Sequence, residues 1–101
     1  MRVGDTMTGS LDEEKVLKFL MENPKYVEIL GRAVKHEETH SKDPYYLGWE
    51  WSDVRAYPAE LMRLVREGIV TIRYKSKRYT RYLLTDREIV KKCLAKLGVK
   101  L

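Results

Sequence analysis

The sequence predicts one small α+β domain that is mostly helical. A chain of 101 residues has room for a single hydrophobic core, and hydrophobic residues make up 44% of it. Apolar residues recur at helical spacing through most of the chain, but from Ile69 onward the period changes to two, which is typical of a β-hairpin. We therefore expect a disordered tail over residues 1–9 and one folded domain over residues 10–101.

Two helices are expected before residue 40. Ser10 to Glu13 matches a capping box that starts the first helix, and an apolar stripe follows at Val16, Leu17 and Leu20. Pro24 disfavours a helical residue before it, so the first helix ends at Asn23 and Pro24 can open the second. The second helix should fade over residues 36–39, and its apolar positions are Tyr26, Val27, Leu30, Ala33 and Val34.

The middle of the chain is less regular. Residues 40–51 show no clean period and are rich in aromatic and turn-forming residues, so we expect an ordered loop with a short extended piece at 45–49. Ser52 is the expected N-cap of a helical turn from Asp53 to Ala56. Pro58 then opens a helix that Gly68 ends, and its apolar face consists of Leu61, Leu64 and Val65.

A hairpin and a last helix complete the predicted domain. Two β-prone runs, 69–75 and 79–84, flank a short polar turn. We expect one face to hold Val70, Ile72, Tyr74, Thr80, Tyr82 and Leu84. The opposite, cationic face would then hold Arg73, Lys75, Tyr79 and Arg81. Thr85 to Glu88 forms a second capping box, which starts a helix whose apolar stripe is Ile89, Val90, Cys93, Leu94 and Leu97.

Composition narrows the classes of function. Twenty Lys and Arg against fifteen Asp and Glu give a net charge of +5, which favours polyanionic partners. No apolar run approaches the length of a membrane span and residues 1–10 lack a signal core, so we expect a soluble, cytoplasmic protein.

Cys93 is the only cysteine, which excludes an internal disulfide, and we expect it in the core. The absence of Gln and the single Asn are typical of thermophile proteins.

One short motif raises the possibility of zinc chemistry. His36 to His40 reads His-Glu-Glu-Thr-His, which matches the pattern of zinc proteases, in which two histidines bind the metal and a glutamate polarises water. The alternative is a chance pair at the frayed end of a charged helix. The helix is expected to end near Ser41, and a third ligand could only be guessed (Asp43, Glu50 or Glu60). We therefore predict no bound metal, no cofactor and no catalysis.

Aromatic residues cluster around the loop. Trp51 and Tyr57 are expected to cover the small core. For Tyr45, Tyr46 and Trp49 two interpretations stay open: core packing, or contact with unpaired bases or a protein partner.

The second half of the chain resembles a known family. The run Leu-Met-Arg-Leu-Val-Arg-Glu-Gly-Ile-Val, from Leu61 to Val70, is followed at once by a basic hairpin and then by Tyr-Leu-Leu-Thr-Asp, from Tyr82 to Asp86. This arrangement resembles the winged-helix family of DNA-binding domains. The hairpin tip, Tyr74 to Tyr79, is similar to those of archaeal members, which occur as small regulators and as appendages of larger ATP-using enzymes. The resemblance implies a winged helix-turn-helix with residues 58–67 as the recognition helix.

The resemblance also implies a DNA interface. Arginine suits a recognition helix because its planar fork pairs with guanine edges or phosphate. The expected DNA-binding residues are Arg55 before the helix, Arg63 and Arg66 on it, and Arg73, Lys75, Lys77, Arg78 and Arg81 on the wing. A simpler alternative is that these cations only solvate an exposed hairpin. Glu60 and Glu67 weaken the case for the helix, because carboxylates repel phosphate.

Two functions follow as hypotheses. The first is a non-catalytic transcriptional regulator or chromatin-associated factor that binds duplex DNA. A homodimer is expected, because two copies double the contacts and because the first helix or the last is expected to hold more apolar surface than one core covers. The alternative is a protein-interaction module of a repair, replication or transcription complex. That role would need an exposed apolar patch near Tyr45, Tyr46 and Trp49.

Overall fold

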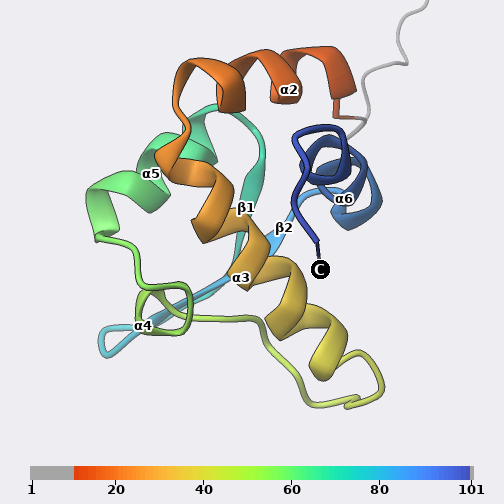
Figure 1. Ribbon diagram of the computed structural model, residues 1–101. Helices are drawn as coiled ribbons and strands as arrows, with labels where there is room; N and C mark the ends of the chain where they lie inside the picture. Colours follow the sequence, from red (N-terminus) through yellow and green to blue (C-terminus); the bar gives the residue numbers. More distant parts are fainter. Residues whose placement is uncertain (1–10, 101) are drawn as a thin grey trace, which may run out of the picture.

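The computed structural model describes residues 11–100, and its elements follow the expected order. The predicted tail over residues 1–9 and the expected cap Ser10 lie outside this range. Figure 1 shows helices around one small hairpin, so the predicted α+β, mostly helical class is confirmed. The elements are α2 (Glu13–Glu22), α3 (Lys25–Thr39), α4 (Trp51–Val54), α5 (Pro58–Arg66), β1 (Val70–Lys75), β2 (Thr80–Leu84) and α6 (Arg87–Lys96).

Helix α3 is the centre of the packing. It contacts α2, α4, α6 and β2, while α2 also packs on α6 and α5 packs on β1. In Figure 1, α5, α4 and the tip of the hairpin lie along one side of the molecule, and α6 lies on the other. Core side chains come from every helix and both strands; the largest of those that are fully buried include Trp49, Leu20, Leu30, Leu61, Leu64, Ile69 and Leu94.

The apolar stripes of α2 and α6 are covered within one chain. Val16, Phe19 and Leu20 are buried, as are Val90, Cys93 and Leu94, and the expectation that Cys93 is a core residue is confirmed. The two helices pack on each other, and Leu17, Ile89 and Leu97 of their stripes are partly buried against the same core, so these helices give little support for a second copy. A homodimer stays a prediction that rests on DNA contacts alone.

Two helices, α2 and α6, are capped by an aspartate rather than by the predicted residue. Asp12 caps α2, and its carboxylate accepts from the backbone N–H of Glu14 at 3.0 Å. Asp86, not Thr85, caps α6 and accepts from the N–H of Ile89 at 3.2 Å. The Thr85 hydroxyl pairs instead with the Thr71 hydroxyl at 2.8 Å.

Helix α4 begins earlier than predicted, at Trp51 with Glu50 as its N-cap, and is only four residues long. The predicted cap, Ser52, lies inside it. The carboxylate of Asp53 accepts from the backbone N–H of Glu50 at 2.9 Å, which fixes this start. The predictions for α5 are confirmed: Pro58 opens it, and Gly68, with φ +78°, follows its end.

The hairpin pairs as predicted at its base and differs at its tip. Val70 lies opposite Leu84 and Ile72 opposite Tyr82, but a β-bulge between Ile72 and Tyr74 then shifts the register. Beyond the bulge Tyr74 lies opposite Arg81 and Lys75 opposite Thr80. Tyr74 and Lys75 have thus exchanged the faces assigned to them, because the extra residue, Arg73, moves every later side chain to the other face.

The segment between α3 and α4, residues 40–50, is the central loop, and a short extended contact places it against the hairpin. Trp49 and Tyr82 exchange two backbone hydrogen bonds, of 2.9 and 2.8 Å, so only Trp49 of the predicted extended piece 45–49 pairs with a strand. Gly48 makes the close approach possible. Its φ is +115°, and a Cβ there would lie 2.3 Å from the carbonyl oxygen of Tyr82.

Among residues 11–100 no helix is both long enough and apolar enough to cross a membrane.

Candidate nucleic-acid interface

The hairpin carries a group of exposed cations. Arg73, Lys75, Lys77 and Arg78 are exposed, and none of them forms an ion pair with another residue of the range 11–100. The sequence between Glu67 and Asp86 contains no acidic residue at all. Four positive charges therefore lie on a short hairpin, and no acidic residue of the range 11–100 pairs with them.

The turn that joins the strands is held by a serine. The Ser76 hydroxyl accepts from the backbone N–H of Arg78 and of Tyr79, each at 3.2 Å. The N–H of Ser76 in turn donates to the carbonyl of Tyr79 at 2.9 Å. These bonds fix the backbone from which Lys77 and Arg78 project into solvent.

Arg81 is engaged differently from the other wing cations. Its guanidinium donates to the carbonyl of Gly48 at 3.3 Å and lies 3.6 Å from the carboxylate of Glu50. It also lies 4.8 Å from the ring centre of Tyr79, and its side chain is 29% exposed. Arg81 therefore braces the hairpin against the central loop, whereas the prediction placed it among the cations that face DNA.

The two arginines of α5 also differ from each other. Arg63 lies 3.6 Å from the carboxylate of Glu67 and 5.2 Å from the ring centre of Phe19. Arg66 is exposed and has no ion-pair partner in the described part of the chain. The same is true of Arg55, which is not on α5 but directly follows α4, where its φ is 55°. Of the eight predicted DNA-binding residues, only Arg63 and Arg81 are thus paired with acidic residues of the range 11–100.

The acidic residues of α5 are occupied by local partners. The carboxylate of Glu60 accepts from the backbone N–H of Tyr57 at 2.9 Å and lies 3.2 Å from the ammonium of Lys25. The hydrogen bond from Tyr57, together with Lys25, lowers the pKa of Glu60. Glu67 pairs with Arg63. Their negative charges are therefore partly offset, which reduces the repulsion of phosphate expected from them.

The aromatic residues are placed differently from the prediction. Trp49 is fully buried, so it can contact neither a base nor a partner protein. Tyr46 is half-buried, and its hydroxyl lies 2.8 Å from Nδ1 of His36; burial raises its pKa. Tyr45 alone of the three is open to solvent. Trp51 and Tyr57, expected in the core, are 52% and 74% exposed.

Glu37 explains why Trp49 rather than Trp51 is buried. Its carboxylate oxygen Oε2 accepts from the indole N–H of Trp49 at 2.9 Å and from the backbone N–H of Leu84 at 2.7 Å. The guanidinium of Arg87 lies 3.7 Å from the other oxygen. Sequence reasoning assigned Glu37 no role in the core. Its spacing from Ala33 and Val34, four and three residues, places it on the buried stripe of α3 and was the available signal.

The two histidines of the His-Glu-Glu-Thr-His motif pack against each other and against Tyr46. Helix α3 runs through His36 and ends at Thr39, and the two histidine rings lie 4.5 Å apart. Nδ1 of His40 lies 2.8 Å from the carbonyl of His36, and the His40 ring stacks on Tyr46 at 4.9 Å. Glu37, which would have to polarise a water, is instead held in the core. Within residues 11–100 no three His, Cys, Asp or Glu side chains gather in a way that could hold a metal ion.

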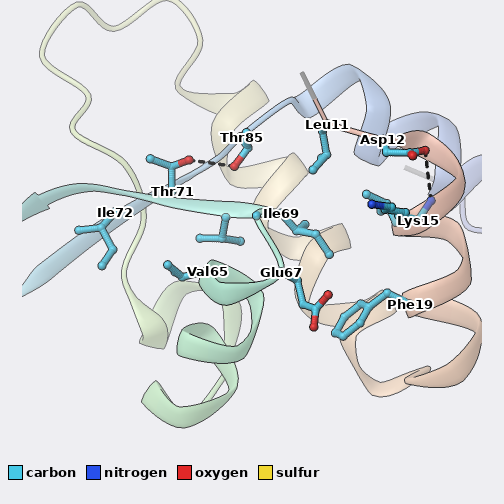
Figure 2. Close-up of a pocket in the computed structure, with 13 residues that line it drawn as sticks. Leu11, Asp12, Lys15, Phe19, Val65, Glu67, Ile69, Thr71, Ile72 and Thr85 are labelled. Carbon is cyan, nitrogen blue, oxygen red and sulfur yellow. Dashed lines mark hydrogen bonds between the residues drawn. The ribbon is translucent and has the colours of Figure 1, made fainter. Parts of the chain in front are cut away.

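Several hollows lie near these elements, and one of about 430 Å³ is lined by His36, His40 and Arg55 among others. A second, of about 360 Å³, is lined by both histidines, Tyr45, Tyr46 and Arg81 among others. A third, of about 620 Å³, lies between α2, the end of α5 and β1, and Figure 2 shows its apolar walls, which include Leu11, Phe19, Ile69 and Ile72. None of the predicted DNA-binding cations lines this third hollow.

No family model, no curated protein and no solved structure matches this chain.

Proposed function

We propose that this domain is a winged helix that binds duplex DNA without catalysis, as a small regulator or chromatin-associated factor. The observation that carries the proposal is the group of wing cations, Arg73, Lys75, Lys77 and Arg78, which are exposed and lack acidic partners among the described residues. Phosphate contacts supply most of the non-specific affinity of DNA-binding proteins. A cluster of free cations on one hairpin is the arrangement that such contacts require.

The order of elements supports the same proposal. Helix α5 is followed at once by the hairpin β1–β2 and then by α6, which is the order that the winged-helix resemblance implies. In Figure 1, α5 and the hairpin tip lie on the same side of the molecule, and a DNA ligand would have to contact both. Arg66 is the side chain of α5 best placed to read a base edge, because it is exposed and free of the pairing that holds Arg63.

A titration of labelled duplex DNA at low salt tests the proposal. We compare the wild type with the triple variant Arg73→Ala, Lys77→Ala, Arg78→Ala. The matched control is Lys18→Ala, Lys92→Ala, Lys100→Ala, which removes the same charge from exposed positions on α2, on α6 and after α6. The wing variant should lose most of its affinity and the control only a small part. Equal losses would mean that net charge alone attracts the DNA, and no binding by the wild type would contradict the proposal.

A second candidate function, a protein-interaction module, has one observation in its favour. The residues first expected to form its patch do not do so, because Trp49 is buried and Tyr46 is half-buried. Instead Trp51, Tyr57 and Met62, on and between α4 and α5, are all more than two-fifths exposed. Aromatic anchors of this kind are enriched in protein interfaces. Failure of duplex binding in the titration above would favour this function.

A further inference from the structure

The wing exposes a pair of aromatic rings among its cations. Tyr74 is 41% exposed and Tyr79 is 37% exposed, and their ring centres lie 5.8 Å apart. Phosphate contacts by lysine and arginine do not require exposed aromatic rings. Aromatic rings among cations are the combination by which proteins bind unpaired bases, since the ring stacks on the base while the cations hold the backbone.

The bulge at Arg73 brings Tyr74 into this pair. In an unbroken ladder Tyr74 would share a face with Val70 and Ile72, which face the core. The register shift between Ile72 and Tyr74 places it opposite Arg81 instead, next to Tyr79. Bulges commonly re-aim a side chain in this way. The hairpin therefore interrupts its regular pairing at the one position that turns this ring away from the core.

A chain of contacts from the body of the domain supports the two rings. Glu50 and the carbonyl of Gly48 hold the guanidinium of Arg81. Arg81 lies over the ring of Tyr79, and the ring of Tyr79 in turn contacts Tyr74. Tyr74 is the outer ring of this series and the more exposed of the two tyrosines. A ring held in place in advance loses little conformational entropy when it stacks on a ligand.

We propose that Tyr74 stacks on an unpaired base, so that the wing binds DNA at sites where the duplex is locally open. The proposal rests on the proposed DNA-binding function and specifies its substrate. Tyr79 and Arg81 are positioning residues for this ring. Arg73, Lys77 and Arg78 are exposed cations of the same hairpin and would hold the phosphates of the strand to which the base belongs, whereas Lys75 lies on the opposite face from Tyr74.

Two duplexes that differ only at their centre test this inference. One is fully paired, and the other has a short run of mismatched, unpaired bases, one of which is 2-aminopurine, whose fluorescence falls when it stacks. The wild type should bind the open duplex about tenfold more tightly, in line with one stacked base, and should quench the probe. Tyr74→Leu should remove both effects while binding the paired duplex as before. Tyr74→Phe, which keeps the ring, should retain both.

The remaining outcomes distinguish failure of this inference from failure of the proposed function. Equal affinity for the two duplexes with no quenching would overturn the inference and leave the proposed function intact. Loss of affinity for both duplexes in a folded Tyr74→Leu variant, checked by circular dichroism, would assign the ring to general binding and also overturn it. If Tyr74→Leu does not fold, Tyr79→Leu serves as the second variant, with a reduced preference expected. Absence of binding to either duplex would overturn both the inference and the proposed function.

Discussion

The indole N–H of Trp49 donates a hydrogen bond of 2.9 Å to the carboxylate of Glu37 inside the core. The same oxygen also accepts from the backbone of Leu84 in β2, so one carboxylate joins α3, the central loop and the hairpin. Burying a carboxylate is costly, and here two N–H donors and the nearby Arg87 offset part of that cost. The base of the wing is therefore anchored to the central helix by Glu37.

Replacing Glu37 by leucine should destabilise the domain strongly. Leucine leaves two buried donors, the indole of Trp49 and the N–H of Leu84, without an acceptor, which costs about 2–4 kcal/mol. Glu37→Gln is the matched control. Because both donors meet the same oxygen, the glutamine carbonyl can accept both, and we expect a change within about 1 kcal/mol. Urea denaturation measures both, and equal losses in the two variants would contradict the anchoring role.

The contribution of Glu37 to the free energy of unfolding should depend on pH. Burial raises the pKa of Glu37 above its ordinary value, despite the opposing effects of its hydrogen bonds and Arg87. Between the unfolded and folded pKa values the folded state binds more protons, so this group makes folding less favourable as pH rises through that window. Above the folded pKa the carboxylate is ionised in both states, and the full cost of burying its charge applies. Glutamine has no such charge, so the free energy of unfolding of Glu37→Gln, relative to that of the wild type, should rise with pH across the window. A constant difference would contradict this.

Gly48→Ala should destabilise the contact between the central loop and β2. An added Cβ would lie 2.3 Å from the Tyr82 carbonyl, and the backbone has φ +115°. We expect a loss of about 2 kcal/mol or more. Gly98→Ala is the control: its φ is also positive, at +83°, but the space around it is open, so only the backbone cost of about 1 kcal/mol applies. Thermal denaturation separates the two, and similar losses would show that the close approach to Tyr82 is unimportant.

Arg66→Ala should change which DNA sequences the domain prefers. If Arg66 reads a base edge, its loss costs about 1–3 kcal/mol on a preferred duplex and less on a scrambled one. Arg63→Ala should have a smaller effect on this preference, because Arg63 is held by Glu67 and Phe19. Competition between two labelled duplexes measures the preference. An unchanged preference in Arg66→Ala would restrict α5 to phosphate contacts.

Local patterns in the sequence predicted most of the elements. Helical spacing located α2, α3, α5 and α6, and the change of period at Ile69 located the hairpin. Pro58 and Gly68 predicted the bounds of α5. The fixed φ of proline suits the first residue of a helix, and glycine readily adopts the positive φ that follows a helix end. The caps were less well predicted, since Asp12 and Asp86 stand next to residues that are equally good caps, and tertiary packing chooses among them.

The site was harder to predict because it depends on contacts between distant residues. Nothing local distinguishes Trp49 from Trp51; the acceptor that buries the first is Glu37, twelve residues away. The bulge that turns Tyr74 outward leaves no mark in an alternating strand pattern. Likewise, the pairing that removes Arg81 from the free cations involves Gly48 and Glu50, which only the fold brings near. The free cations Arg73, Lys75, Lys77 and Arg78 needed no such contacts to be found.

The salt dependence of duplex binding tests the central claim most directly. For the wild type, the logarithm of the association constant should fall linearly with the logarithm of salt concentration, because bound phosphates release counterions. Removing Lys77 or Arg78 should reduce that slope by roughly one for each phosphate that the variant no longer binds. Lys92→Ala, on α6, should leave the slope unchanged. A slope that is the same in the wild type and in both wing variants would contradict the account, because the hairpin would then not contact the DNA backbone.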